Sequence, residues 1–348
     1  MSTVARTTIA NLSREIVTEA DAYLHLEGLR WGDVPRCAHC ESTEVHLIPP
    51  ANGVSRKTAA GTMSERRVWR CHSCRKQFSV LTGTIMHATK IPVRTWVLVI
   101  FDMCCAKNGI SAREVERKYG VCARTAWHML HRIRSAMGSD NKFVASMRGV
   151  IVADETWIGG DPERMNHQTA KRLIRRRMDG MGGGTAKTPV LSLVNMATGE
   201  VRSCVVNRVT GATLRKAISE QVDMANSTLF TDSASYYRQL GKEFYAHQAV
   251  DHSAGEYVRG KVSTNMAEGF FSQLKRSIDG THHHVSPKHL PRYLGEFDFR
   301  YSTCKMSDYG RMRTLAGRME GRLSYGRLIG DHYRHPFSGV EIAPGQRT

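Results

Sequence analysis

The first part of the chain alternates helical and irregular stretches. After a polar start, the spacing of apolar residues predicts one short amphipathic helix near residues 13–29. Residues 31–81 are irregular, with a polar loop rich in Gly, Ser and Lys at 52–66. From 92 to 137, apolar side chains recur three or four positions apart, and this spacing predicts further helices.

From residue 143 onward the pattern becomes that of a sheet with helices. The apolar run at 150–153 predicts a buried strand that ends in carboxylates, and residues 188–207 predict a hairpin that turns at Thr198–Gly199. The rest of this part predicts a helix, a strand, a short helix, a strand and two longer helices, at 213–224, 227–234, 236–243, 245–250, from about 264, and 286–301. This mixture predicts an α/β fold with a mixed sheet.

Two basic segments do not fit this pattern. Residues 171–187 interrupt the predicted sheet, and we expect them to form a basic loop. Residues 306–348 are rich in Gly and Arg, and we expect a loosely ordered tail.

The charge balance indicates the kind of partner. The chain has 50 Lys and Arg against 32 Asp and Glu, a formal net charge of +18 and a pI near 9.8. Such an excess favours a polyanionic partner, because each phosphate neutralised by a cation releases condensed counterions. We therefore expect a nucleic acid as partner. The alternative is a basic protein with a well-solvated surface.

Nothing in the sequence indicates a membrane protein. No apolar run approaches the roughly 18–20 residues that span a bilayer, and the N-terminus lacks the pattern of a signal peptide. We expect a cytoplasmic protein without a membrane partner. Its nine cysteines are then mostly reduced, so that clustered ones are better explained as metal ligands than as disulfides.

Four of the cysteines form two C-x-x-C pairs, which contain Cys37, Cys40, Cys71 and Cys74. Each pair can turn its two sulfurs toward one point, and two such pairs close a tetrahedral four-thiolate site for Zn²⁺. Because the protein fills all four coordination positions of the ion, the predicted zinc is structural. Its binding supplies much of the folding energy of the segment that carries the two cysteine pairs, a zinc ribbon. Two histidines inside the pairs could replace a thiolate, although we expect them on the surface: His39 and His72.

Residues 108–134 have the pattern of a helix-turn-helix. We expect Ser111 to cap the first helix, Glu114 to complete a capping box, and Gly120 to provide the tight turn. The second helix places three side chains near one face, and we predict that they contact DNA: Arg124, His128 and Arg132. The alternative is a plain helical hairpin with cationic ends, because the motif is loose and common.

Three carboxylates are placed as the ligands of a catalytic metal site. Asp154 and Asp232 each end a predicted strand, and Glu268 lies one turn into a predicted helix. Such an oxygen-only set suits a hard ion, Mg²⁺ or Mn²⁺. Two ions about 4 Å apart can activate the attacking oxygen and stabilise the leaving oxygen of a phosphodiester displacement. Lys275 lies two turns beyond Glu268 on the same helical face, where it could meet a phosphate.

Each carboxylate also has a simpler explanation. Asp154 could begin a turn, with Glu155 beside it as an alternative ligand. Asp232 could cap the next helix, and Glu268 could close a capping-type pair with Asn265. Taken together at the edge of a predicted sheet in a basic chain, the three are better explained as one site.

Three stretches of sequence resemble a known family: residues 37–95, the segment VADETWIGG at 152–160, and residues 263–302, which begin STNMAEGFF. Over nearly all of residues 30–305 the chain resembles bacterial zinc-ribbon transposases, in the insertion-sequence family numbered 1595. The resemblance implies an RNase H-like catalytic domain with a DDE-type triad. Carried over residue by residue, the triad is Asp154, Asp232 and Glu268, with Lys275 as the trailing basic residue.

The resemblance leaves the third ligand open. Some relatives have Asn at the third acidic position, so that Asn265 is an alternative to Glu268. We prefer Glu268, because a carboxylate binds a hard ion better than an amide does. Arg276, next to Lys275, is also expected to contact DNA.

The pattern along the chain and the resemblance, which does not cover the tail, together predict five consecutive parts. They are a helical lead-in (1–30), a zinc ribbon (31–90), a helical helix-turn-helix region (91–142), an RNase H-like DDE catalytic domain (143–305) and a basic tail (306–348). The fold class is thus α/β, with a mixed-sheet catalytic domain preceded by the ribbon and the helices.

The function implied is that of a transposase in the bacterial cytoplasm, associated with the nucleoid. Its partner would be double-stranded DNA, as element ends and as target. It would bind the ends of its element, cleave the DNA at the 3′ end with two metal ions, and join that end to target DNA. Pairing two ends requires a homodimer or a higher oligomer. Two alternatives stay open: a zinc-ribbon DNA-binding regulator without catalytic activity, and a structure-specific nuclease on the same fold.

Overall fold

The computed structural model describes residues 7–50, 53, 55–57, 63–138, 145–159, 187–250, 258–259 and 262–330. The chain forms two compact units. Unit 1 consists of Met1–Met137 and Met306–Tyr325, and unit 2 of Gly138–Lys305 and Gly326–Thr348. The loop predicted at 171–187 lies outside the described residues except for Lys187, and so does the end of the predicted tail, 331–348.

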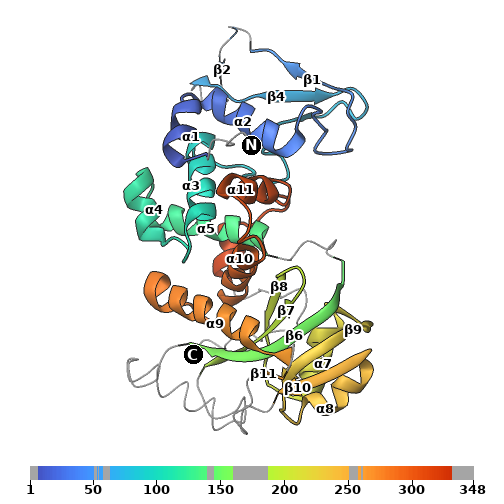
Figure 1. Ribbon diagram of the computed structural model, residues 1–348. Helices are drawn as coiled ribbons and strands as arrows, with labels where there is room; N and C mark the ends of the chain where they lie inside the picture. The colour runs from blue at the N-terminus through green and yellow to red at the C-terminus, as the bar shows by residue number, and fades with distance from the viewer. Residues whose placement is uncertain are drawn as a thin grey trace, which may run out of the picture. The chain divides into compact units, whose positions relative to one another are not determined.

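A small antiparallel sheet forms the ribbon of unit 1 (Figure 1). Its strands are β1 (Val45–Ile48), β4 (Val68–Cys71) and β5 (Gln77–Phe78), and a separate pair consists of β2 (Arg56–Lys57) and β3 (Met63–Ser64). Trp31 packs edge-on against Trp69 and Phe78, with ring centres 5.9 Å apart in both cases. The buried members of this apolar cluster are Cys37, Cys71 and Phe78. Such a small cluster stabilises a fold weakly, so the ribbon depends on its cysteines.

The N-terminal part of the chain was predicted as one helix and forms two, of which the second packs on the ribbon. The structure has α1 (Ile9–Glu15) and α2 (Glu19–Trp31), because Thr18 caps α2 in a capping box with Asp21. The Glu27 carboxylate on α2 accepts hydrogen bonds from Arg67 Nε at 2.9 Å and from Trp69 Nε1 at 2.8 Å. These bonds tie α2 to the ribbon strand β4.

The helices predicted at 92–137 are α3 (Val93–Cys105), α4 (Ala112–Tyr119) and α5 (Ala123–Met137). Nine of the thirteen residues of α3 are buried, so this helix is the core of unit 1. Both α2 and α11 (Asp308–Ala316) pack against it. No helix in the described part of the chain is long and apolar enough to cross a membrane.

The prediction of a loosely ordered tail is wrong for the residues that follow 306. They form α11 and α12 (Tyr325–Ile329). Arg311 Nη1 donates to the Cys104 carbonyl at 2.9 Å, and the Ile85 N–H donates to the Met319 carbonyl at 2.8 Å. The chain therefore returns to complete the core of unit 1 after it has built the sheet of unit 2.

Unit 2 contains a five-stranded mixed sheet in the order β10-β9-β6-β7-β8. The strands are β6 (Met147–Ile158), β7 (Thr188–Asn195), β8 (Val201–Val205), β9 (Val222–Asp232) and β10 (Ala246–Val250). Strand β6 pairs antiparallel with β7 and parallel with β9, and β9 pairs parallel with β10. This confirms the predicted α/β fold with a mixed sheet. A two-stranded sheet of β11 (Val258–Arg259) and β12 (Val262–Ser263) precedes the last helices of the unit.

Helices cover both faces of this sheet (Figure 1). One face packs against α9 (Asn265–Ser277), the π-helical turn Ile278–His282 and α10 (Leu290–Ser302). The other packs against α7 (Gly211–Ser219), α8 (Tyr237–Leu240) and the 3-10 turn Gly241–Glu243. The helix predicted at 213–224 is shorter than expected because β9 begins at Val222, which pairs with Met147 of β6.

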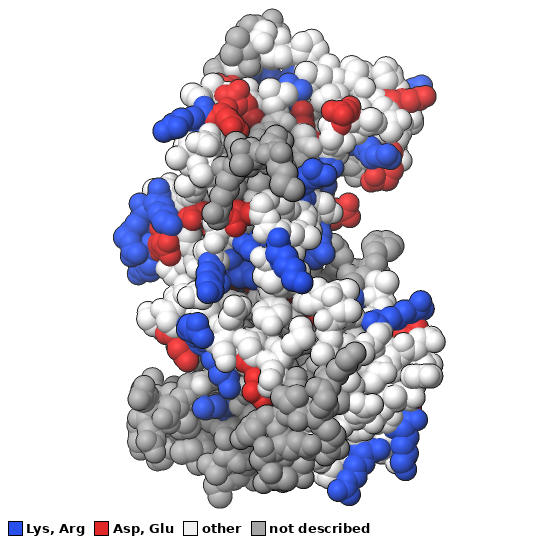
Figure 2. All heavy atoms as spheres, in the orientation of Figure 1, with Lys and Arg blue, Asp and Glu red and all other residues white. Residues whose placement is uncertain are grey.

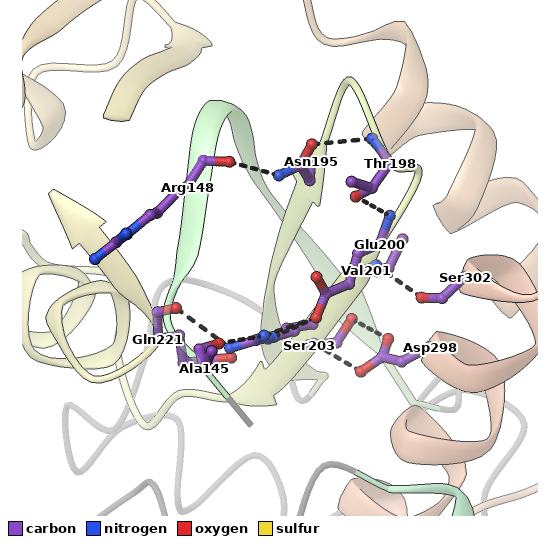
Figure 3. Close-up of polar contacts among 11 residues, drawn as sticks. Ala145, Arg148, Asn195, Thr198, Glu200, Val201, Ser203, Gln221, Asp298 and Ser302 are labelled. Atoms are coloured by element: carbon purple, nitrogen blue, oxygen red, sulfur yellow. Dashed lines mark hydrogen bonds and ion pairs between the residues drawn. The ribbon is translucent and has the colours of Figure 1, made fainter. Parts of the chain in front are cut away.

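Polar contacts join the β7–β8 hairpin to α10 (Figure 3). The Ser203 N–H and hydroxyl both donate to the Asp298 carboxylate at 2.7 Å, and the Val201 N–H donates to Ser302 Oγ at 2.9 Å. Burial raises the pKa of Asp298 to about 7. The hairpin turns at Thr198–Gly199, as predicted, with Gly199 in the left-handed region at φ 74°.

Candidate metal centres and nucleic-acid interface

The four cysteines of the two C-x-x-C pairs come together in unit 1. Their sulfurs lie within 4.8 Å of one another, and the Sγ–Sγ distances of Cys37–Cys74 and Cys40–Cys71 are both 3.6 Å. A tetrahedral zinc site with Zn–S bonds of about 2.3 Å has sulfur–sulfur edges of roughly 3.8 Å. The cluster therefore fits a structural zinc ion. In the described part of the chain, no other group of three or more His, Cys, Asp or Glu ligand atoms gathers so closely.

The two cysteine pairs lie on turns of the same local geometry. In each turn the N–H of the first cysteine donates to the carbonyl five residues on: Cys37 to Ser42 at 2.9 Å, and Cys71 to Lys76 at 3.1 Å. The residue after the second cysteine has a left-handed backbone in both, with φ 60° at Glu41 and 59° at Arg75. The chain thus builds the same metal-binding turn twice.

Backbone N–H groups also point at the sulfurs of these turns. The Cys74 N–H lies 3.4 Å from Cys71 Sγ, and the His39 N–H lies 3.4 Å from Cys37 Sγ. The thiolate is the form that binds zinc, and a hydrogen bond from an N–H group favours the charged sulfur. Both histidines inside the pairs are exposed, as expected; His39 contacts the Gln77 carbonyl and His72 contacts His46.

Asp154 and Asp232 lie at equivalent positions on two neighbouring strands of the sheet in unit 2, just beyond the last residues that pair those strands. The parallel pairing of β6 and β9 aligns Val152 with Phe230, and each aspartate lies two residues past its member of that pair. Neighbouring strands are about 4.8 Å apart. Asp154 is paired with Ser192 inside β6, so it does not begin a turn. Asp232 ends β9, and its carboxylate accepts from the Ala234 N–H at 3.2 Å.

Both aspartates are on the sheet face that α9 covers. Successive residues of a strand point to opposite faces, so each aspartate shares a face with the residue two positions before it. Those residues, Val152 and Phe230, belong to the core that also contains Ala267 and Phe270 of α9. The two carboxylates therefore lie at the end of the core beneath this helix.

Glu268 lies in the first turn of α9 and is exposed. Its carboxylate accepts a hydrogen bond from Thr264 Oγ1 at 3.1 Å, so its partner is Thr264 and not the Asn265 of the predicted capping pair. Because α9 packs on the face that carries Asp154 and Asp232, its first turn brings Glu268 to the same side of the sheet. Asn265, the alternative third ligand, is the first residue of α9 and is exposed as well.

Glu155 lies on the opposite face from Asp154. It is buried, with an exposed fraction of 8%, and accepts hydrogen bonds from the hydroxyls of Tyr236 and Tyr237. Burial raises the pKa of Glu155 to about 7, the two tyrosine hydroxyls lower it, and the charges of Asp154 and Asp232 raise it further. This arrangement separates Glu155 from the face that holds the two aspartates, so it is a poor alternative ligand.

The helix-turn-helix geometry is present in unit 1. Ser111 Oγ accepts from the Glu114 N–H at 3.1 Å and so caps α4, and Gly120 ends that helix in the left-handed region at φ 67°. The Glu114 side chain instead pairs with Lys118 at 2.7 Å. The structure thus has the predicted Ser111 cap and the predicted turn at Gly120. The Glu114 carboxylate faces along α4 and not back toward the cap.

The three predicted DNA contacts of α5 differ in exposure. Arg124 is exposed near the start of the helix. His128 is half-buried, with Nε2 3.0 Å from the Leu323 carbonyl, and burial lowers its pKa. Arg132 is 7% exposed, donates to the His87 carbonyl at 2.8 Å and stacks on Trp96. Arg132 therefore packs inside unit 1, and of the three only Arg124 is presented to a partner.

Other exposed cations, which were not predicted from the sequence, lie around this turn. Lys and Arg side chains gather over α4 (Figure 2), and Arg113 and Arg117 lie exposed on that helix. Their spacing of four residues in a helix was the signal that could have identified them. In unit 2, Lys275 and Arg276 are both exposed near the end of α9.

Comparisons with known proteins agree with this geometry. Residues 146–302 match the family model described as ISXO2-like transposase domain, and residues 17–77 match the transposase zinc-ribbon domain. Together the matches cover more than half of the chain. The chain is also similar to an uncharacterized protein in the transposable element ISH50 of Halobacterium salinarum, with 23% identity over 306 residues, or 87% of this chain and 97% of the relative.

Proposed function

Because the chain belongs to the zinc-ribbon insertion-sequence transposases that these two family models describe, we propose that it binds the ends of its element and cleaves and joins DNA strands with divalent metal ions. The observation that carries this proposal is the placement of Asp154 and Asp232 side by side on neighbouring strands. They face the helix whose first turn bears Glu268.

The three carboxylates supply the oxygen ligands that Mg²⁺ and Mn²⁺ prefer. Two such ions, when bound, activate the attacking oxygen and stabilise the leaving oxygen of a phosphodiester. The register of β6 and β9 brings Asp154 and Asp232 to neighbouring strand ends, and Thr264 orients Glu268 through its hydroxyl. Lys275 and Arg276 hold phosphates of the bound strand near these carboxylates.

The reaction has two steps in this proposal. Water attacks the phosphodiester at the element end and releases a 3′-hydroxyl, which then attacks a phosphodiester of the target DNA. The first step is a hydrolysis that leaves a 5′-phosphate beside the released 3′-hydroxyl. The second is a transesterification that forms one phosphodiester bond, breaks one in the target and releases a target 3′-hydroxyl. Water and the 3′-hydroxyl are the two nucleophiles, so no side-chain nucleophile and no covalent protein–DNA intermediate are needed.

DNA contacts in unit 1 come from the exposed cations around Gly120. Arg113 and Arg117 on α4 and Arg124 on α5 flank the turn between these helices. Exposed guanidinium groups bind phosphate oxygens in a bidentate manner. The zinc ribbon provides further contacts through Arg70, Arg75 and Lys76, which are exposed at its cysteine turns.

We also propose the RNase H-like fold for unit 2, which the mixed parallel and antiparallel order of its sheet supports. Two element ends must be held together for joining, so the active form is a dimer or a higher oligomer on DNA. Such a protein acts on the nucleoid of its cell.

The test is a strand-transfer assay with zinc-loaded protein, labelled element-end DNA, target plasmid and Mg²⁺ or Mn²⁺. Joined product that requires the divalent ion is the expected result. Cleavage without joining would identify a nuclease instead. DNA binding without any strand chemistry in either metal would identify a regulator.

A matched pair of variants in the same assay assigns the third ligand. Glu268→Gln keeps the size of the side chain and removes its charge, so we expect it to abolish joining. Asn265→Ala, three residues before it on α9, should retain joining. The reverse pattern would assign the third position to Asn265.

A further inference from the structure

A buried polar cluster lies directly beneath the proposed catalytic carboxylates, on the opposite face of the sheet. It consists of Glu155, Tyr236 and Tyr237. Tyr237 is 1% exposed and Glu155 is 8% exposed, whereas Tyr236 is partly buried and packs against the core formed with α7 and α8. Burying a carboxylate is costly unless its oxygens are hydrogen-bonded. The catalytic proposal gives none of these three residues a role.

Both oxygens of Glu155 are used in this cluster. The Tyr236 hydroxyl donates to Oε2 at 3.0 Å, and the Tyr237 hydroxyl donates to Oε1. The two tyrosine rings lie 5.1 Å apart, so each helps to fix the other. The Glu155 carboxylate therefore binds two consecutive residues of the chain, and these two hydrogen bonds fix its own orientation.

The residues of the cluster lie close in sequence to the two aspartates. Glu155 immediately follows Asp154 on β6, whereas Tyr236 and Tyr237 follow Asp232 by four and five residues. The hydrogen bonds therefore connect β6, which carries Asp154, to the segment that follows Asp232. The pairing of β6 with β9 ends at Val152 and Phe230, before either aspartate is reached. Beyond that pair, the hydrogen bonds of Tyr236 and Tyr237 to Glu155 connect the two strand ends, and we call this connection the tie.

A second contact holds the same segment in place. A Cβ atom added to Gly211, the first residue of α7, would lie only 3.1 Å from the Tyr236 carbonyl oxygen. The start of α7 thus supports the backbone of Tyr236 from the side. With its backbone supported and its hydroxyl bonded, Tyr236 defines where the chain lies after Asp232.

We propose that Glu155 is a positioning residue that, through Tyr236 and Tyr237, fixes the separation of Asp154 and Asp232. This inference rests on the proposed function, in which the two aspartates bind the same metal ions. Two carboxylates on adjacent strands repel each other when no metal is bound. A tie on the other face of the sheet resists that repulsion and keeps the ligands at the spacing that metal binding requires. Groups that orient metal ligands in this way influence metal affinity by about 10- to 100-fold when altered.

The experiment compares the Mg²⁺ dependence of strand cleavage in the full-length protein and four variants. Tyr236→Phe and Tyr237→Phe each remove one hydroxyl, and Glu155→Leu removes both acceptors. Glu155→Gln keeps a carbonyl oxygen for one tyrosine and an amide group that can donate to the other hydroxyl oxygen. Tyr245→Phe is the control, because Tyr245 is 81% exposed on the same unit.

The expected result is a shift in the Mg²⁺ concentration that gives half-maximal cleavage. It rises about 10-fold or more in the tyrosine variants and in Glu155→Leu, stays within about threefold of wild type in Glu155→Gln, and does not change in Tyr245→Phe. The rate at saturating metal is largely recovered. Mn²⁺ binding, measured by titration without DNA, shifts in parallel and does not depend on catalysis.

Three results would overturn this proposal. Variants that lose maximal rate and melting temperature at unchanged Mg²⁺ dependence would show that the cluster only stabilises the fold. A Glu155→Gln variant as inactive as Asp154→Ala, and with Mn²⁺ binding abolished, would show that Glu155 is itself a ligand. Unchanged Mg²⁺ dependence in Glu155→Leu would show that the tie has no effect. If the wild type itself shows no metal-dependent cleavage but binds Mn²⁺, the proposed function fails, and the binding titration still tests the positioning role.

Discussion

The guanidinium of Arg132 lies 5.3 Å from the centre of the Trp96 ring. The same side chain donates to the His87 carbonyl at 2.8 Å, and burial lowers the pKa of Arg132 to about 10. Arg132 is on α5 and Trp96 is on α3, so this contact holds two helices of unit 1 together. Arg124, two turns earlier on α5, is exposed.

We therefore predict that substituting these two arginines of α5 has different effects, one on stability and the other on DNA binding. Arg132→Ala should lower the free energy of unfolding of unit 1 by about 2–3 kcal/mol, because a desolvated cation–π contact and a charged hydrogen bond are lost. Arg124→Ala should leave stability unchanged, weaken DNA binding, and reduce the slope of log K against log salt by about 1. Urea unfolding and fluorescence anisotropy at several salt concentrations measure the two effects. Loss of DNA binding in a fully stable Arg132→Ala protein would contradict this assignment.

Zinc removal should unfold the ribbon. Its buried apolar cluster is small, so the metal–thiolate bonds supply much of the free energy of folding. A strong chelator should release a single zinc ion per chain and abolish the near-ultraviolet circular dichroism contributed by Trp31 and Trp69. Cys74→Ser should do the same, whereas Cys122→Ser, at an exposed cysteine of the same unit, should keep its zinc. An intact ribbon after complete zinc loss would be incompatible with a structural metal site.

The left-handed residue of each cysteine turn gives a further prediction. Glu41 has φ 60°, a conformation that costs an L-residue about 1–2 kcal/mol and costs glycine little. We expect Glu41→Gly to be as stable as the wild type or slightly more stable. Glu41→Val should lower the stability of the ribbon by more than 1 kcal/mol, roughly, because a β-branched residue is strained there. Zinc-dependent thermal unfolding of the two variants is the measurement, and equal stabilities would be inconsistent with the turn described.

The buried Asp298 predicts how the stability of unit 2 depends on pH. The pKa of this carboxyl is raised, mainly by burial, from 3.8 to about 7. The folded state therefore holds a proton that the unfolded state loses between about pH 4 and 7, so this contribution to stability is complete below pH 4 and disappears as pH rises to 7. The slope is at most about 1.4 kcal/mol per pH unit. Asp298→Asn should flatten the pH dependence, as measured by urea titration with hydrogen exchange of β8. A variant whose stability falls in parallel with the wild type would refute this.

Much of unit 2 could be predicted because its signals are local. The apolar run before Asp154 gives β6, and Thr198–Gly199 marks the hairpin turn. The boundary of β9 could not be predicted, because Val222 joins the strand through its pairing with Met147. A long-range contact of this kind overrides the helix preference of the local sequence.

The candidate sites also contain residues that local patterns predict and residues that depend on long-range contacts. The spacing of Cys37, Cys40, Cys71 and Cys74 predicts the metal cluster, because each pair forms its own turn. The alternation of a strand could also have placed Glu155 opposite Asp154. Its partners Tyr236 and Tyr237 lie some 80 residues away, at separations of 81 and 82, and no local pattern indicates them. The burial of Arg132 likewise depends on His87 and Trp96, which belong to other segments.

Strand transfer by Asp154→Ala and Asp232→Ala, at equal DNA binding and with Mg²⁺ present, tests whether these two neighbouring carboxylates bind the metal ions that drive the reaction. We predict that each variant binds element-end DNA as the wild type does and forms joined product at least about 100-fold more slowly, a larger loss than for groups that only orient the ligands. Joined product at the wild-type rate in either variant would contradict the account.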